Sequence, residues 1–71
     1  MIATSRPAAV FEVAKELKVS PKFARKLVLE SSNEWLTANA FAASPERFAS
    51  ALEDELSYFI DSGLIPTVEF A

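Results

Sequence analysis

The sequence predicts an all-α domain of three to four short helices, and three observations lead to this expectation. Apolar residues recur at the spacing of a helix face in the segments 10–17, 23–28 and 48–60. Serine–proline pairs at 20–21 and 44–45 have the chemistry of a helix start, and the single glycine, Gly63, stands where a helix would end. We therefore expect one domain over residues 1–71, with a two-helix unit over 7–30, a long acidic helix over 44–63 and an extended tail over 64–71.

The first helix is expected to begin near Pro7, after a frayed arm over residues 1–6, because proline suits the first helical turn. Its apolar residues share one face: Val10, Val13, Ala14 and Leu17. Lys18 and Val19 are expected to form the turn that follows.

The second helix is expected to start with Ser20 as N-cap and Pro21 at the first helical position. Its apolar side consists of Phe23, Ala24, Leu27 and Val28. At 100° per residue, three cations fall on the opposite side: Lys22, Arg25 and Lys26. Leu29 lies among these cations, where it is available to thymine methyl groups or to a protein.

A third, short helix is expected to begin at Ser31, because Ser31 and Glu34 have the spacing of a capping box. It would continue through Trp35, Leu36, Ala40 and Phe41. An extended segment over residues 32–43 is the alternative, since Thr37 and Asn39 disfavour a helix.

The last helix begins with Ser44, Pro45 and Glu46, which places an acidic residue in the first turn, where the helix dipole favours it. About half of its circumference is apolar by helical projection, which suggests either a central helix or a dimer interface. The candidate interface consists of Phe48, Leu52, Glu55, Leu56 and Phe59.

Glu55 lies within this apolar arc, where an unpaired carboxylate would be costly. We expect it to lie near an edge of the arc or to pair with Arg47, Lys15 or another cation of its own fold. The alternative is that it receives a basic residue from a partner. The apolar tail over 64–71 is expected to cover the core or to pack on a partner.

Charge divides the chain into two unlike halves. Lys and Arg outnumber Asp and Glu by 6 to 2 over residues 1–29, whereas the ratio is 1 to 8 from residue 30 onward. The halves therefore carry +4 and −7, which suggests different partners for each half, although they could also neutralise each other within one fold.

Composition excludes several kinds of chemistry. The 71 residues include no Cys and no His, so disulfides, thiolate or imidazole metal sites and the common acyl-transfer triads are unavailable. One glycine cannot form a phosphate-binding loop. We expect no enzyme, no cofactor, no metal and no small-molecule substrate. No segment resembles a signal peptide or a membrane span, so a cytoplasmic location is expected.

Residues 10–28 resemble the helix-turn-helix of small DNA-binding regulators. The resemblance rests on Ala14 as the small residue of the first helix, on Leu17 and Val19 around the turn, and on Ala24 and Leu27, which pack the second helix back. It implies that the second helix enters DNA, with these contacts: Lys18, Ser20, Lys22, Arg25 and Lys26.

One departure from the pattern concerns Lys18, which stands where the family usually has glycine. A left-handed backbone there would cost about 1 kcal/mol. The segment 10–20 is also similar to the small N-terminal module of bacterial translation initiation factor two, a similarity that stops near Leu27.

The sequence thus supports two hypotheses. The first is a small, non-enzymatic, dimeric transcriptional regulator that binds double-stranded DNA. The second is a protein-interaction module, antitoxin-like or a phage-type inhibitor, that acts through its acidic C-terminal half. The overall acidity favours the second, because DNA-binding domains usually carry net positive charge. A solvated surface is the alternative to any binding role for the basic helix.

Overall fold

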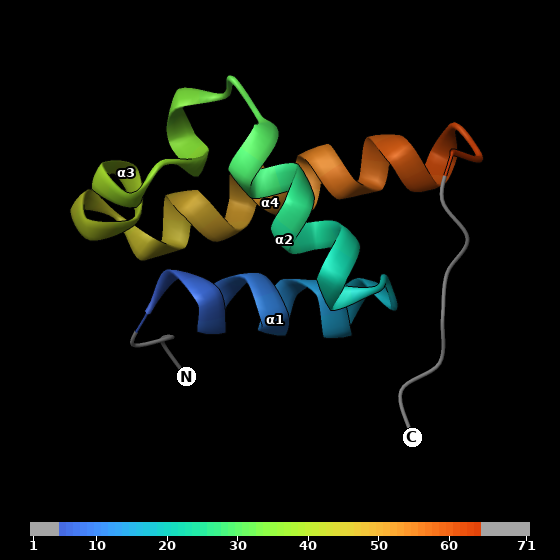
Figure 1. Cartoon of the computed structure of the whole chain (residues 1–71), viewed down its shortest axis with the longest axis horizontal. Coiled ribbons are helices and arrows are strands. Elements are labelled where there is room, and N and C mark those ends of the chain that lie inside the picture. Colours follow the sequence, from blue (N-terminus) through green and yellow to red (C-terminus); the bar gives the residue numbers. More distant parts are fainter. Residues whose placement is uncertain (1–4, 65–71) are drawn as a thin grey trace.

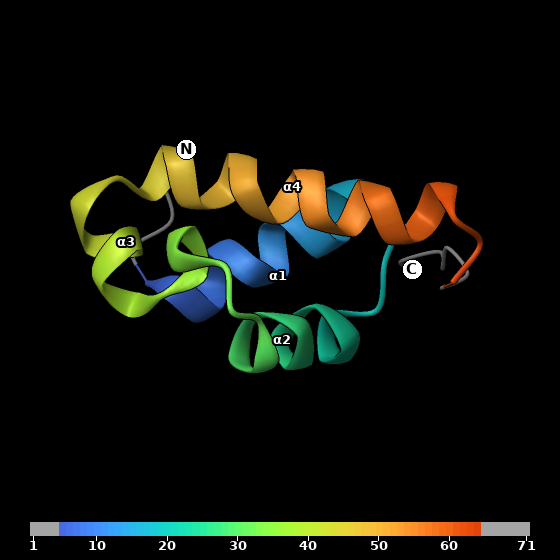
Figure 2. The ribbon, with the colours of Figure 1, turned by 90° about the horizontal axis from the view of Figure 1, so that it is seen from above.

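The computed structural model describes residues 5–64, and this part of the chain is all-α. Its elements, in chain order, are α1 (Arg6–Leu17), α2 (Pro21–Glu30), the 3₁₀ turn η1 (Glu34–Leu36), α3 (Ala38–Ala43) and α4 (Pro45–Asp61). The helices α1 and α4 run in the same direction along the length of the molecule, and α2 crosses in front of them (Figure 1). Seen from above, α2 and α4 lie on opposite sides of the molecule (Figure 2).

The core forms where α1 packs against both α2 and α4. The largest of the fully buried side chains are Phe48, Leu36, Leu52, Leu56 and Val19. The ring of Phe41 packs edge-on against Phe48, with the ring centroids 5.4 Å apart. Each fully buried leucine or phenylalanine stabilises the fold by about 1.5–3 kcal/mol, so these contacts supply much of the driving force.

The apolar stripe of α4 therefore belongs mainly to the core of this chain. Phe48, Leu52 and Leu56 are 0% exposed, so their side chains offer no surface to a partner. Of the candidate interface residues, only Phe59 and Glu55 retain partial exposure. The wide apolar stripe had two explanations, a central helix of the core or a dimer interface. Their complete burial assigns these three residues to the core.

Helix α1 begins one residue earlier than the sequence suggested. The Ser5 hydroxyl accepts a hydrogen bond from the Ala8 amide at 3.3 Å, so Ser5 is the N-cap and Pro7 occupies the second helical position. Arg6, expected in a frayed arm, is helical, and its Nη1 donates to the Leu36 carbonyl at 3.4 Å. The expectation was wrong here because it considered proline alone and not the capping serine two positions before it.

The prediction of a capping box at Ser31 and Glu34 is also wrong. The Ser31 hydroxyl accepts from the Asn33 amide at 3.0 Å, which closes a local turn after α2. Asn33 then caps η1 through Oδ1, which accepts from the Trp35 amide at 2.9 Å. Thr37 caps α3 in the same way, with its Oγ1 accepting from the Ala40 amide at 3.1 Å. Two competing caps divide the expected third helix into η1 and α3.

The boundaries of α4 agree with the sequence prediction. The Ser44 hydroxyl accepts from the Arg47 amide at 3.3 Å, and Pro45 follows as the first helical residue. Gly63 has a φ of 71°, the left-handed conformation expected after the helix. The amide of Gly63 donates to the Ile60 carbonyl and that of Leu64 to the Phe59 carbonyl, both at 3.0 Å, which is a Schellman motif. The rest of the expected tail, residues 65–71, lies outside the described residues.

Candidate nucleic-acid interface

The turn between α1 and α2 is a second Schellman motif, but with lysine in the left-handed position. Lys18 has φ 58° and ψ 45°. Its amide donates to the Lys15 carbonyl at 3.2 Å, and the Val19 amide donates to the Ala14 carbonyl at 2.9 Å. Val19 and Ala14 are both buried, as the apolar contact of this motif requires. The left-handed backbone at Lys18, and its cost of about 1 kcal/mol, therefore follow from the geometry.

Ser20 occupies the N-cap position of α2, as expected, yet its side chain makes no capping hydrogen bond. The Ser20 carbonyl instead accepts the Ala24 amide at 3.0 Å, the first bond of the helix. Pro21 holds the first helical position. Proline suits this position because it has no amide hydrogen that would need a partner there.

The two sides of α2 differ as the sequence predicted. Ala24 and Val28 are buried against the rest of the protein, with Ala24 0% exposed. Lys22, Arg25 and Lys26 are exposed. Lys18 is exposed at the turn and Ser20 is half-buried. Leu29 lies among these cations and is 66% exposed, so an apolar side chain interrupts the basic surface.

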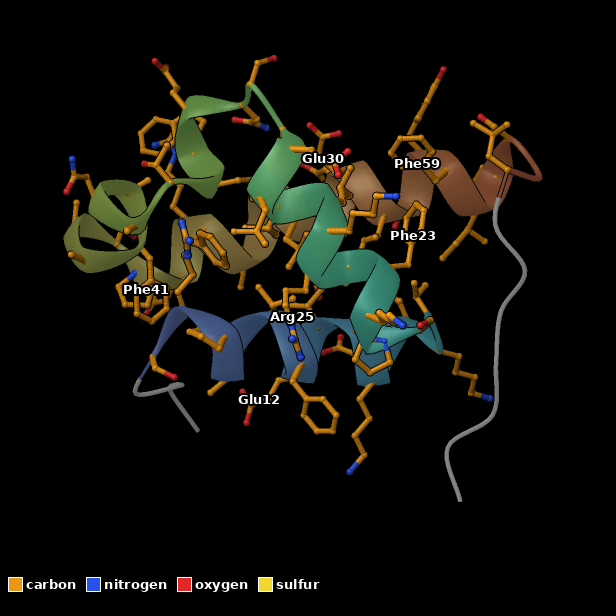
Figure 3. The ribbon with its side chains drawn as sticks, viewed as in Figure 1. Glu12, Phe23, Arg25, Glu30, Phe41 and Phe59 are labelled. Carbon is orange, nitrogen blue, oxygen red and sulfur yellow. The ribbon has the colours of Figure 1, made fainter. Side chains whose placement is uncertain are left out.

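Arg25 extends from α2 over α1, on the side of the molecule that carries Glu12 (Figure 3). It also lines a surface groove of about 370 Å³ between α1 and α2, together with Val10, Val28 and Leu29. Arg6 and Pro7 line the same groove. Two arginines thus line this groove together with apolar side chains, and Arg6 also donates to the Leu36 carbonyl.

Arg6 is the residue of this surface that sequence reasoning missed. The signal was present in the chain, since Ser5 precedes Pro7 at a spacing that allows a serine cap with proline in the first turn. Recognition of that cap would have moved Arg6 from a frayed arm to the first turn of α1.

Glu55 bonds to an uncharged side chain. It is half-buried, and its Oε1 accepts a hydrogen bond from the Asn33 Nδ2 at 3.3 Å. Its partial exposure agrees with the expectation that it lies near an edge of the apolar arc, and its hydrogen-bond partner is Asn33 in place of the alternative partners Arg47 and Lys15. The cation of Arg47 lies over the Trp35 ring instead, 4.1 Å from the ring centroid. Asn33 carries no charge, so charge complementarity in the sequence could not identify it as the partner.

One acidic side chain of α4, that of Glu53, is electrostatically perturbed. Glu53 is half-buried, and burial together with the nearby Glu16 carboxylate on α1 raises the pKa of Glu53. Asp54 adds a smaller effect in the same direction. Like charges therefore crowd at the contact between α1 and α4.

Within residues 5–64, no three His, Cys, Asp or Glu side chains come together in a group that could hold a metal ion. In the same part of the chain, no helix is long and apolar enough to cross a membrane. No protein family, curated protein or solved structure matches the chain.

Proposed function

We propose that this chain is a small, non-enzymatic DNA-binding regulator whose helix α2 contacts duplex DNA. One observation supports the proposal most directly: α2, which lies at one side of the molecule (Figure 2), has three exposed cations, whereas its Ala24 and Val28 are buried in the protein. A helix of this kind has an apolar side for its own domain and a basic side for phosphates and base edges.

The dimensions of α2 suit this role. Its 10 residues extend about 15 Å, and the major groove of DNA is about 12 Å wide. The cations lie in its first six residues, which is the part of a recognition helix that contacts bases. Arg25 can bind a guanine edge through two hydrogen bonds, whereas Lys22 and Lys26 suit phosphates. Lys18 and Ser20, at the turn, would contact the backbone of the DNA.

The test is a fluorescence-anisotropy titration of the full chain with mixed-sequence duplex DNA at several salt concentrations. Three phosphate contacts predict a slope of about −2.7 in log affinity against log salt. A fourfold rise in salt should then weaken binding about 40-fold. Lys22→Ala combined with Arg25→Ala should reduce the slope to about −1.8, because one of the three phosphate contacts is lost, and should weaken binding further through the lost base contact, while helical content is unchanged.

A charge-matched control removes two cations elsewhere, as Lys15→Ala with Arg47→Ala. Both residues are exposed and neither belongs to α2. The proposal fails if the parent does not bind at low salt, or if both double variants lose the same affinity. The dimer expected from the sequence stays a prediction, which sedimentation equilibrium of the free chain tests.

A second candidate function, an acidic protein-interaction module, is favoured by the crowding of Glu16 and Glu53. Burial and the nearby Glu16 carboxylate raise the pKa of Glu53, and a basic partner would relieve the repulsion between the two carboxylates. Charge reversal of Glu53, Asp54 and Asp61 would then abolish binding of a lysine-rich peptide. In that case the Lys22→Ala, Arg25→Ala double variant would bind the peptide like the parent.

A further inference from the structure

A groove between α2 and α4 combines apolar side chains with one cation and one anion. It has a volume of about 400 Å³ and is lined by Phe23, Lys26, Leu27, Glu30, Ser31 and Phe59. Its three apolar side chains are half-buried. Its two charged side chains, Lys26 and Glu30, are exposed. This groove is separate from the one between α1 and α2.

A row of three aromatic rings begins in this groove. Phe23 and Phe59 meet edge-on, with ring centroids 5.9 Å apart and planes at 79° (Figure 3). The ring of Tyr58 meets Phe59 edge-on in turn, with centroids 5.6 Å apart, and Tyr58 is 64% exposed. Aromatic residues are enriched in protein interfaces, because each buries a large apolar area with few rotatable bonds. The row of rings therefore suits contact with a protein surface.

The two charges of the groove indicate which protein surface fits. Lys26 and Glu30 are four residues apart on α2, so they lie on one side of the helix, about 6 Å apart along its axis. A partner of uniform charge would attract one of them and repel the other. A second copy of α2 that runs in the opposite direction presents Glu30 to Lys26 and Lys26 to Glu30. The groove is thus complementary in charge to another copy of itself.

An antiparallel contact of this kind has two-fold symmetry, the commonest symmetry among homo-oligomers. Each chain contributes the same surface, so the ion pair between Lys26 and Glu30 occurs twice. Packed helices have axes about 8–10 Å apart, a separation that lysine and glutamate side chains at the edge of the contact can span. Phe23 and Leu27, which line the same groove, would be covered by the second chain.

We propose that the groove between α2 and α4 is a homodimer interface, in which the α2 helices of two chains lie antiparallel and exchange ion pairs between Lys26 and Glu30. Of the interface residues expected from the apolar stripe of α4, only Phe59 lines this groove. The dimer uses Lys26 alone among the three exposed cations of α2, since Lys22 and Arg25 lie outside the groove. The proposal does not depend on nucleic-acid binding.

Sedimentation equilibrium of the full chain tests this interface through charge reversal. Because each ion pair occurs twice, Lys26→Glu should weaken the dimer about 10-fold, and Glu30→Lys should do the same. Lys26→Glu combined with Glu30→Lys should restore the affinity of the parent, because it exchanges the two charges and keeps the net charge of −3. An equimolar mixture of the two single variants should form a mixed dimer of similar affinity.

Lys15→Glu is the matched control, because Lys15 is an exposed cation on α1 and the variant changes the net charge as Lys26→Glu does. It should dimerise like the parent. Recovery in the double variant and in the mixture cannot arise from a folding defect of the single variants.

Three outcomes overturn the proposal. The parent chain could stay monomeric up to about 1 mM, which excludes a dimer of measurable affinity. A dimer that is as strong in both single variants as in the parent forms through another surface. A double variant that dimerises as weakly as the single variants shows that Lys26 and Glu30 do not pair across the interface.

Discussion

Replacing Lys18 by glycine is expected to stabilise the fold. Lys18 holds the left-handed position of a Schellman motif, where a Cβ costs about 1–2 kcal/mol. Glycine increases the freedom of the unfolded chain, which offsets about 0.5–1 kcal/mol of that gain. The side chain is exposed, so its removal takes no packing away. The net expectation is a gain of about 0.5–1 kcal/mol in the free energy of unfolding.

Thermal and urea unfolding followed by circular dichroism measure this gain. For a domain of this size, the change corresponds to a rise of about 2–8 °C in the melting temperature. Lys18→Ala is the matched control, because it removes the charge and keeps the Cβ. It should leave stability nearly unchanged.

The Schellman motif at Gly63 allows the reverse substitution, which should lower the free energy of unfolding. Gly63 has a φ of 71°, and a Cβ placed there would meet no atom within 4 Å. Gly63→Ala should therefore destabilise the chain by about 1 kcal/mol through backbone strain alone. If Lys18→Gly proves no more stable than Lys18→Ala, the argument from left-handed strain is refuted.

Three further perturbations test the remaining contacts. Phe48→Ala should cost about 3–5 kcal/mol, a large share of the roughly 4–10 kcal/mol expected for a chain of this length, and urea unfolding would show it. Asn33→Ala removes the cap of η1 and the donor to Glu55 and should cost about 1 kcal/mol or more; equal stability of parent and variant would contradict this. The pKa of Glu53 is raised, so its contribution to stability is complete below the ordinary value of 4.5 and is lost as the pH rises through the folded pKa. Glu53→Gln should therefore melt at a higher temperature than the parent at neutral pH, and the difference should disappear in acid; a difference that is constant with pH would exclude the burial of the Glu53 charge and its repulsion by Glu16 as the cause.

Local signals predicted the helix ends where one residue had no competitor. Ser44 and Pro45 start α4, and Gly63 ends it, because each acts on backbone groups within four residues. The same reasoning failed at Ser31, where Asn33 and Thr37 each offered a cap of their own. A capping motif in the sequence states what a side chain can do, and neighbouring side chains decide which cap forms.

The candidate DNA-binding surface was predictable for a related reason. The period of a helix alone separates the three cations of α2 from the apolar side that contains Ala24 and Val28, and the structure finds the cations exposed and these two residues buried. Arg6 was missed because its position depends on the start of α1, which the proline by itself did not locate.

The sequence by itself determined the helical class, most helix boundaries and the two sides of α2, because these depend on contacts between residues close together in the chain. Only the tertiary structure decided that Phe48, Leu52 and Leu56 belong to the core and that Glu55 bonds to Asn33, 22 residues away. These outcomes depend on how α1, α2 and α4 cross. That crossing is set by the packing of whole helix faces, and no local pattern of residues encodes it.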